Sequence, residues 1–297
     1  MSVSKNSERL HMLMAFTGNA IFGFSFLFSK LALNVAEPFV LLAARFSVAF
    51  LLMTVLMVTG LVKCDLKGKD IKPLIILGLW QPVVYFICES YGIKFTSSSF
   101  SGTIIALVPI MGILLGVFIL REKPTLVQIL FSILSVAGVI VMTVTDDMGS
   151  GFQWKGFVLL LGAVLAAAMF SIQSRSIADQ FTSFERTYVM FGLGTVVFVV
   201  MALLRTGLNM GLWMGPLTNG GFWISIVYLS CVSSVGAFLL LNKALDVLPV
   251  ARSLVFANVT TVISVLAGVF ILHEHFTPVQ IVGIAMVLIG IYGVNRE

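Results

Sequence analysis

The sequence predicts an all-α integral membrane protein with ten transmembrane helices, built as two inverted five-helix repeats around a central cavity. Three observations predict this fold class: a very apolar composition, ten long apolar stretches, and one segment that occurs twice. Hydrophobic residues make up 59% of the 297-residue chain and charged residues only 10%, against about 25% charged in an average soluble domain. The mean hydropathy of +1.08 agrees with a chain that lies mostly in lipid.

Ten apolar stretches of roughly 20 residues are each long enough to cross a hydrocarbon layer of about 30 Å as a helix. Lipid cannot hydrogen-bond to the backbone, so spanning segments are helices or barrel strands, and these stretches lack the alternation of strands. The connections are short, and the longest is predicted to be a Gly-rich turn region at 206–220. We predict helices at 11–33, 38–62, 73–94, 99–120, 125–145, 154–176, 184–205, 221–243, 250–272 and 277–294.

One thirteen-residue segment occurs twice at a fixed offset. GVFILREKPTLVQ, which starts at Gly116, returns as GVFILHEHFTPVQ from Gly268, and nine of the thirteen positions are identical. Val, Ile and Leu match often by chance in an apolar chain, so the argument depends on the shared Glu, Thr and Gln. The chain is therefore predicted to be two copies of one unit, at 1–148 and 149–297, each with five helices.

The positive charges predict the orientation in the membrane, because cytoplasmic connections retain Lys and Arg. With the N-terminus inside, three cations fall outside, namely Lys94, Lys155 and Arg205. Five helices per unit is an odd number, so the second unit enters the membrane from the opposite side and the repeats are inverted. The cations on the inner side are Lys5, Arg9, Lys63, Lys67, Lys69, Lys72, Arg121, Lys123, Arg175, Arg186, Lys243, Arg252 and Arg296.

Several function classes are disfavoured by the same residues. The formal charge of +5 follows from topology and anionic headgroups, so no nucleic-acid partner is predicted. Three cysteines and three histidines are scattered, which predicts neither a metal site nor a disulfide framework. The sequence contains no phosphate-binding loop, no H-E-x-x-H and no G-x-S-x-G motif, so we expect no bound cofactor, no ATP-driven pumping and no enzyme activity.

Several motifs occur along the chain in an order and spacing typical of one known family. They are the run Asn19-Ala-Ile-Phe-Gly23, Lys30, Arg45, the run Tyr91-Gly-Ile-Lys-Phe-Thr-Ser97, Pro109, Glu122 and Glu274. On these residues, the chain from about residue 11 to 293 resembles the EamA-type, ten-helix branch of the drug/metabolite transporter superfamily. The sequence differs from many members in having Phe22 before the glycine and Thr261 where a second proline would stand. The resemblance implies a polytopic carrier, usually an exporter of amino acids, other metabolites or drugs, with both termini cytoplasmic.

Three ionisable residues inside predicted helices are the first candidates for contact with a transported molecule. Lys30, Arg45 and Glu89 all fall in the outer third of the membrane, and buried charges of this kind usually face the protein interior. Two cations and one carboxylate could leave one positive charge for a substrate carboxylate or phosphate. Alternatively, Lys30 and Arg45 extend to the interface or pair with Glu89 to fix helix packing.

The third predicted helix carries a polar stripe of Gln81, Tyr85 and Glu89 at intervals of four residues. Pro82 removes a backbone hydrogen bond beside this stripe and leaves a carbonyl for water or substrate. Trp80 adjoins the stripe, and an aromatic ring beside polar groups can hold an amphipathic molecule or simply pack. This helix face is predicted to line the substrate site.

Polar residues on other helices complete the predicted substrate site. Asn19 lies on the first helix, Tyr228 on the eighth and Asn258 on the ninth. Glu122 and Glu274 are assigned to structural turns instead, because each precedes a helix start where a carboxylate can interact with exposed N–H groups.

These predictions combine into a secondary transporter of small organic metabolites, an amino-acid exporter by alternating access in a bacterial plasma membrane, with both termini cytoplasmic. Its expected partners are the small substrate, the lipid bilayer and protons, with Glu89 as the proton-coupling candidate, and a monomer can enclose the whole site. The alternatives are an exporter of cationic drugs, an uptake carrier, a channel, and a membrane protein that transports nothing.

Overall fold

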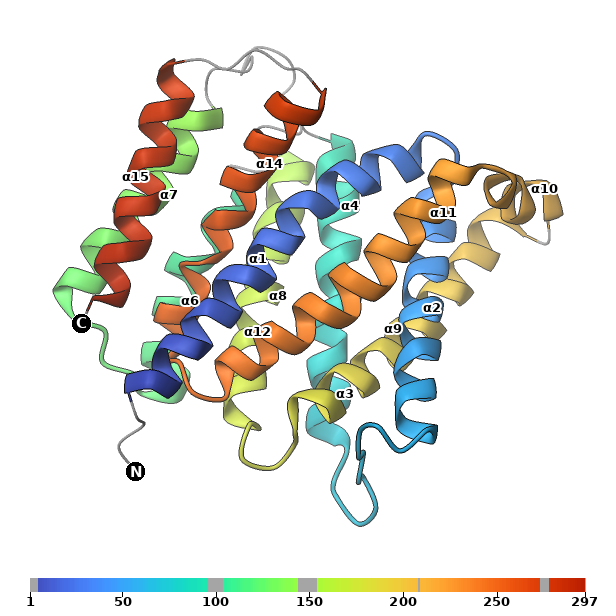
Figure 1. Ribbon diagram of the computed structural model, residues 1–297, viewed down its shortest axis with the longest axis horizontal. Coiled ribbons are helices and arrows are strands. Elements are labelled where there is room, and N and C mark those ends of the chain that lie inside the picture. Colours follow the sequence, from blue (N-terminus) through green and yellow to red (C-terminus); the bar gives the residue numbers. More distant parts are fainter. Residues whose placement is uncertain (1–4, 96–103, 144–153, 208, 273–277, 297) are drawn as a thin grey trace.

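In the computed structural model, all regular secondary structure is helical within the described residues, which are 5–95, 104–143, 154–207, 209–272 and 278–296 (Figure 1). The all-α class is thereby confirmed for this part of the chain. The helices in chain order are α1 (Lys5–Leu33), α2 (Pro38–Val58), α3 (Lys72–Gly78), η1 (Leu79–Val84), α4 (Tyr85–Phe95), α6 (Val108–Leu115), η2 (Gly116–Leu120), α7 (Leu126–Thr143), α8 (Trp154–Ser176), α9 (Ser183–Thr206), α10 (Met210–Met214), η3 (Gly215–Thr218), α11 (Gly220–Val227), η4 (Tyr228–Ala237), α12 (Phe238–Leu245), α13 (Val250–Leu254), α14 (Ala257–Leu272) and α15 (Pro278–Asn295).

Many of these helices are suited to a bilayer. Six continuous segments of the described chain are long and apolar enough to cross a membrane, and four shorter apolar helices accompany them. The number of spanning helices stays a prediction. The six long segments are Ser7–Leu33, Pro38–Val58, Lys72–Glu89, Trp154–Ser176, Ser183–Thr206 and Gly220–Leu245, and the shorter ones are Val108–Leu120, Leu126–Val141, Val250–Ile263 and Ile281–Asn295.

Helix ends follow local capping chemistry. Glu37 caps α2 by accepting hydrogen bonds from the backbone N–H groups of the first turn, and Pro38 occupies the first helical position. Thr182 and Glu185 form a capping box at the start of α9. The Glu185 carboxylate also accepts from Lys69 at 3.1 Å, so one capping residue fixes the connection between α2 and α3.

The connection between α9 and α11 is more ordered than the predicted turn region. It contains the short helix α10 and the single 3-10 turn η3. Asn209 starts α10 by accepting from the backbone N–H of Gly211 at 3.0 Å, and Asn219 does the same for α11 through Phe222. The glycines of this segment correctly predict that the chain breaks between two long helices. The short helical turns within the connection were not predicted, and Asn caps allow them.

The two halves of the chain interleave and do not form two separate bundles. In Figure 1, α7 runs beside α15, and α2 lies along α9. Helix α1 packs against α14 and α12, whereas α8 packs against α4 and α6. Both chain termini lie at the same end of the molecule (Figure 1). Any motion between two parts of this protein must therefore move helices from both halves together.

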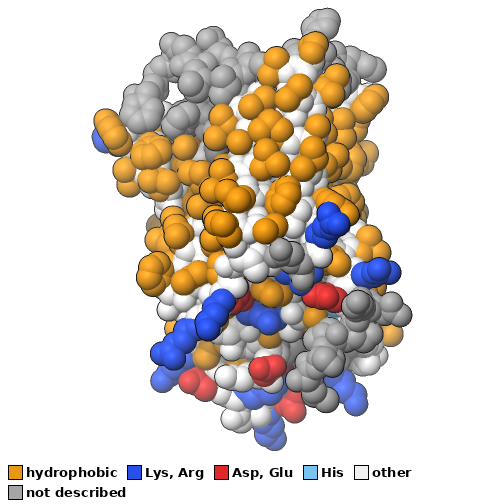
Figure 2. Space-filling view, turned by 90° about the vertical axis from the view of Figure 1, so that its left-hand side faces the viewer, with side chains coloured by type: hydrophobic (Ala, Val, Ile, Leu, Met, Phe, Trp, Pro, Cys, Tyr) orange, Lys and Arg blue, Asp and Glu red, His pale blue; other side chains and the backbone are white. Residues whose placement is uncertain are grey.

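The surface is mostly apolar. Figure 2 shows charged side chains gathered toward one end of the molecule, with hydrophobic side chains over most of the remaining face. Large hydrophobic residues are openly exposed, such as Leu204 at 81% and Phe118 at 79%. Exposure on this scale is unfavourable in water and expected in lipid, because the hydrocarbon layer solvates apolar side chains. The charged end is then the part that meets headgroups and water.

Close contact between α7 and α15 depends on glycine, which gives a first prediction. A Cβ atom added at Gly138 would lie 2.6 Å from the carbonyl oxygen of Gly283 and 2.8 Å from Cβ of Met286. Gly138→Ala should lower the free energy of unfolding by about 1–3 kcal/mol, because backbone cannot yield as a side chain can. Thermal unfolding in detergent measures this, with Gly220→Ala as the control because nothing lies within 4 Å of its Cβ position. Equal stability of the two variants would contradict the prediction.

Candidate functional site

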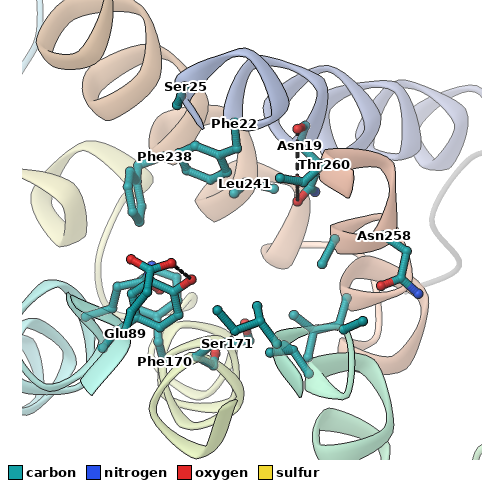
Figure 3. Close-up of a pocket in the computed structure, with 18 of the residues that line it drawn as sticks. Asn19, Phe22, Ser25, Glu89, Phe170, Ser171, Phe238, Leu241, Asn258 and Thr260 are labelled. Carbon is teal, nitrogen blue, oxygen red and sulfur yellow. Dashed lines mark hydrogen bonds between the residues drawn. The ribbon is translucent and has the colours of Figure 1, made fainter. Parts of the chain in front are cut away.

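A cavity of about 290 Å³ lies between the two halves of the chain. Its wall is formed by α1, α2, η1, α4 and α6 from the first half and by α8, α12, α13 and α14 from the second. Figure 3 shows side chains from these helices pointing into it. A volume near 300 Å³ is at the lower end of the range for small-molecule sites. The cavity therefore suits a small organic molecule.

One end of the cavity, here called the charged pole, consists of Arg45, Tyr85 and Glu89. The Tyr85 hydroxyl donates a hydrogen bond to Oε1 of Glu89 at 2.9 Å. These two residues are four apart on α4, so they share one helix face, as the predicted polar stripe requires. Gln81 of η1 also lines the cavity. The helix is interrupted at Gln81, with φ −145° and ψ 122°, beside Pro82 as the sequence predicts.

Arg45 is held inside the protein and does not extend to the interface. It is 5% exposed, and its Nε and Nη2 atoms donate to Oγ of Ser234 at 2.8 Å and of Ser233 at 3.0 Å. The Phe46 and Phe86 rings lie 5.7 and 5.5 Å from the guanidinium carbon, within range of a cation–π contact. Serines of η4 and rings of the first half thus fix the cation at the cavity wall.

Arg45 and Glu89 line the same cavity without an ion pair of 4.0 Å or less between them. The neutralised pair considered from the sequence is therefore absent between these two described residues. Each residue keeps one atom available for a further hydrogen bond. Among the described residues, Nη1 of Arg45 has no acceptor and Oε2 of Glu89 has no donor. A cation and an anion side by side can each bind the opposite charge of a guest.

The other end of the cavity, here called the amide pole, consists of Asn19, Asn258, Thr260 and Thr261. Asn258 donates from Nδ2 to Oγ of Ser135 at 2.9 Å, and Thr260 donates to the backbone oxygen of Asn19 at 3.0 Å. Figure 3 shows Asn19, Thr260 and Asn258 together on the side of the cavity away from Glu89. This end is polar but carries no charge among its described residues.

The middle of the cavity is apolar. Four of its lining residues are Phe22, Phe170, Phe238 and Leu241. In Figure 3, Phe238 and Phe170 appear on the side of Glu89, and Phe22 and Leu241 lie between Phe238 and Asn19. Phe22 and Phe238 meet edge-on with ring centroids 5.1 Å apart, and Phe170 meets Phe238 at 6.0 Å. None of these four residues is predicted from the sequence to line the site. The chain has 25 phenylalanines, and nothing in their spacing separates cavity rings from core rings.

Three residues assigned to the site, and Glu274 assigned to a turn, do not appear in the described cavity wall. Trp80 packs against the large apolar core beside α9. The Tyr228 hydroxyl donates to the backbone oxygen of Ile21 at 2.9 Å, and its ring stacks on Phe28 at 4.1 Å, which makes it a packing contact between α1 and η4. The side chain of Lys30 and all of Glu274 lie outside the described residues.

Glu122 lies away from the cavity and joins the two halves. Its Oε1 accepts from the backbone N–H of Val250 at 3.1 Å, the first residue of α13, so the helix it meets is not the next one along the chain. Glu122→Gln should lower stability by about 1 kcal/mol and leave substrate preference unchanged, because an amide oxygen accepts the same bond more weakly. Thermal unfolding and substrate competition measure the two effects. A normally stable variant with altered preference would contradict this prediction.

Comparison with known proteins identifies the family. The model of the EamA-like transporter family matches residues 9–144 and 154–296. The chain belongs to this family. A relative named "Uncharacterized transporter YcxC" from Bacillus subtilis is 34% identical to this EamA chain over 294 residues, covering 98% of the chain and 94% of the relative. These matches confirm the resemblance and make the protein a membrane transporter.

Two further matches place this EamA protein more widely. A "Probable terminal-alkyne amino-acid exporter" from Streptantibioticus cattleyicolor is 22% identical over 231 residues, covering 78% of this chain and 75% of the exporter. A solved structure titled "Crystal structure of protein" superposes with a TM-score of 0.79 at 18% identity, covering 95% of both chains. At this low identity, the solved structure supports the fold of the EamA chain and not its function.

Proposed function

We propose that this EamA protein is a secondary exporter of amino acids. The observation that carries the proposal is the charged pole, where Arg45 and Glu89 line one cavity without pairing to each other. An α-amino acid carries one carboxylate and one ammonium group on the same carbon atom, so it complements such a pair. The distant relative named as an amino-acid exporter supports the same substrate class.

Binding would proceed through opposite charges in a site with little water. The substrate carboxylate binds Nη1 of Arg45, whose other donors are already held by Ser233 and Ser234. The ammonium group binds Oε2 of Glu89, whose other oxygen accepts from Tyr85. Both side chains are held in place before substrate arrives, which lowers the entropy lost on binding. The apolar rings in the middle of the cavity then contact the substrate side chain.

We propose that the chain is two inverted repeats, 1–148 and 149–297, with ten spanning helices. The pattern of helix contacts supports this arrangement. The packing of α1 against α14 and α12 has a counterpart in the packing of α8 against α6 and α4, with the roles of the two halves exchanged. Helices α2 and α9 pair with each other, as do α7 and α15, as expected for equivalent helices beside a two-fold axis. Alternating access between inverted repeats follows the common design of secondary transporters.

We assign both termini and the charged end to the cytoplasm of a bacterial cell. The termini lie at one end of the molecule (Figure 1), and Lys69, Lys243 and Arg252 form their ion pairs in connections or helix ends on that side. Cytoplasmic connections retain positive charge, so this end faces inward. Export then carries an amino acid from this side to the opposite one.

Counterflow into proteoliposomes tests the proposed function. Purified protein is reconstituted, and labelled amino acids, small carboxylates and cationic drugs are offered to vesicles loaded with the same unlabelled compound. We expect saturable exchange of zwitterionic amino acids. Arg45→Met should weaken it at least about tenfold, because charge-assisted hydrogen bonds contribute about 1.5–3 kcal/mol each. Exchange of cationic drugs alone, by folded protein, would contradict the proposal.

A further inference from the structure

The amide pole carries a hydrogen-bonding group that the charged pole does not use. Asn258 is 1% exposed, lies in α14 and lines the cavity. Its Nδ2 donates to Ser135 of α7 at 2.9 Å, and this bond fixes the orientation of the side-chain amide. Figure 3 shows its oxygen on the side of the cavity and its nitrogen on the far side. The amide therefore offers a fixed acceptor to whatever occupies this end.

The neighbouring polar groups reinforce that acceptor. Thr260 binds the backbone oxygen of Asn19 at 3.0 Å, and Nδ2 of Asn19 binds the backbone oxygen of Ala15 at 2.8 Å. These bonds occupy the groups that could otherwise turn toward Asn258. No described donor to Oδ1 of Asn258 is recorded. Because Oδ1 of Asn258 faces the cavity, a guest that donates to it gains a hydrogen bond that an apolar guest cannot form.

The two poles face each other across the apolar middle of the cavity. Figure 3 places Glu89 on one side and Asn258 on the other, with Phe238 on the side of Glu89 and Leu241 on the wall between the two sides. A guest held by its charged groups at Glu89 and Arg45 would direct its side chain over these apolar residues toward Asn258. The end of that side chain is then the part that meets the amide pole.

We propose that Asn258 is a specificity-determining residue that selects amino acids whose side chains end in a hydrogen-bond donor, such as an amide. This inference rests on the proposed function and adds the chemistry of the side chain to it. An apolar side chain of equal length would fill the same space and leave Oδ1 of Asn258 unpaired. Sites that hydrogen-bond a substrate group discriminate strongly against the analogue that lacks it.

The test uses pairs of amino acids that are nearly equal in shape and differ in polarity. Glutamine and methionine form the longer pair, and asparagine and leucine the shorter one. Each unlabelled compound competes with a labelled amino acid that the protein exchanges. We expect the amide member of at least one pair to compete about five- to tenfold better in the unmodified protein. Asn258→Leu, which keeps the volume, should reduce that ratio to about one or reverse it.

Two further variants keep the test decisive. Ser135→Ala removes the partner that fixes the Asn258 amide from outside the cavity wall and should weaken the amide preference, because Nδ2 can then turn toward the guest in place of Oδ1. If Asn258→Leu does not fold, Asn258→Ala is used, because it also removes the acceptor at this lining position and adds no bulk.

The outcomes separate this inference from the proposed function. If no amino acid is exchanged by folded protein, the proposed function is wrong and the inference fails with it. If amino acids are exchanged but neither pair shows an amide preference, only the inference is overturned. If the preference exists and survives Asn258→Leu unchanged, Asn258 does not determine it. A preference that the variant removes supports the assignment.

Discussion

Arg186→Met should destabilise the protein more than any other single change considered for this chain. Arg186 of α9 is completely buried and pairs with Asp246, which follows α12. It also donates to the backbone oxygen of Ser174 at 2.6 Å, to Oγ of Ser183 at 3.3 Å and to the backbone oxygen of Asn242 at 3.2 Å. Met keeps an unbranched apolar stem in place of the Arg186 stem and removes every donor. These acceptors would then be left buried without the cation that satisfies them.

The expected loss is about 3 kcal/mol or more in the free energy of unfolding, because removing one partner of a buried ion pair typically costs 3–5 kcal/mol. Chemical unfolding followed by tryptophan fluorescence measures it. Lys243→Met is the matched control, since Lys243 also lies 3.5 Å from Asp246 but is 56% exposed. That change should cost at most about 1 kcal/mol. Equal losses in the two variants would show that the Asp246 charge, and not the buried Arg186 network, matters.

Arg186 also shows what could not be predicted from the sequence. Their positions near predicted helix ends place Arg186 and Arg252 among the cations of the inner side. The structure buries both: Arg252 pairs with Glu8 at 2.5 Å, and Arg186 with Asp246. Hydropathy along the chain places a cation at a membrane end. It cannot say whether a carboxylate from a distant helix arrives there.

The fold class was predictable because it depends on local properties. A helix that spans lipid needs only a long apolar run, so composition and hydropathy predict it, and Pro82 predicts the interruption at Gln81. The interleaving of the two halves was not predictable in this way. It depends on which helix faces come close, and close approach requires glycine opposite backbone, as at Gly138 and Gly290.

The site was predictable in part for the same reason. Tyr85 and Glu89 share one helix face, so their spacing predicts that they lie together, and both line the cavity, where Figure 3 shows Glu89. Trp80 lies one residue before Gln81 and was assigned with the stripe, but it packs into the core. The four apolar residues of the cavity wall could not be predicted from the sequence, because they come from three helices that meet only in the folded chain.

Glu89→Gln should abolish accumulation driven by a pH difference while leaving exchange of substrate intact at saturating concentration. Among the described residues that line the cavity, Glu89 is the one carboxyl group, with Arg45 and Tyr85 as the other ionisable groups beside it. Gln is nearly equal in shape and its oxygen can still accept from Tyr85. It cannot bind and release a proton between pH 5 and 8, so substrate can cross without a proton moving in return.

The physical basis for coupling is competition for one carboxylate. An unpaired charge inside a membrane protein is unfavourable. The protein therefore changes between its inward-open and outward-open states more readily when Glu89 is neutralised, either by a substrate ammonium group or by a proton. Each change of state then carries either a substrate molecule or a proton across the membrane, so substrate and protons move in opposite directions. For one proton per substrate, a difference of one pH unit stores about 1.4 kcal/mol, enough for about tenfold accumulation. The variant should reach no accumulation, because its amide needs no neutralisation.

The measurement is uptake into proteoliposomes under a pH difference of one unit, with the membrane potential held at zero by potassium and valinomycin. Exchange without a pH difference is measured in the same vesicles and shows that the variant folds and binds. Glu37→Gln is the matched control, because its carboxylate caps α2 outside the cavity wall and should leave accumulation unchanged. Accumulation by Glu89→Gln equal to that of the unmodified protein would exclude Glu89 as the coupling residue. Absence of pH-driven accumulation in the unmodified protein would mean that transport is facilitated diffusion through the same cavity.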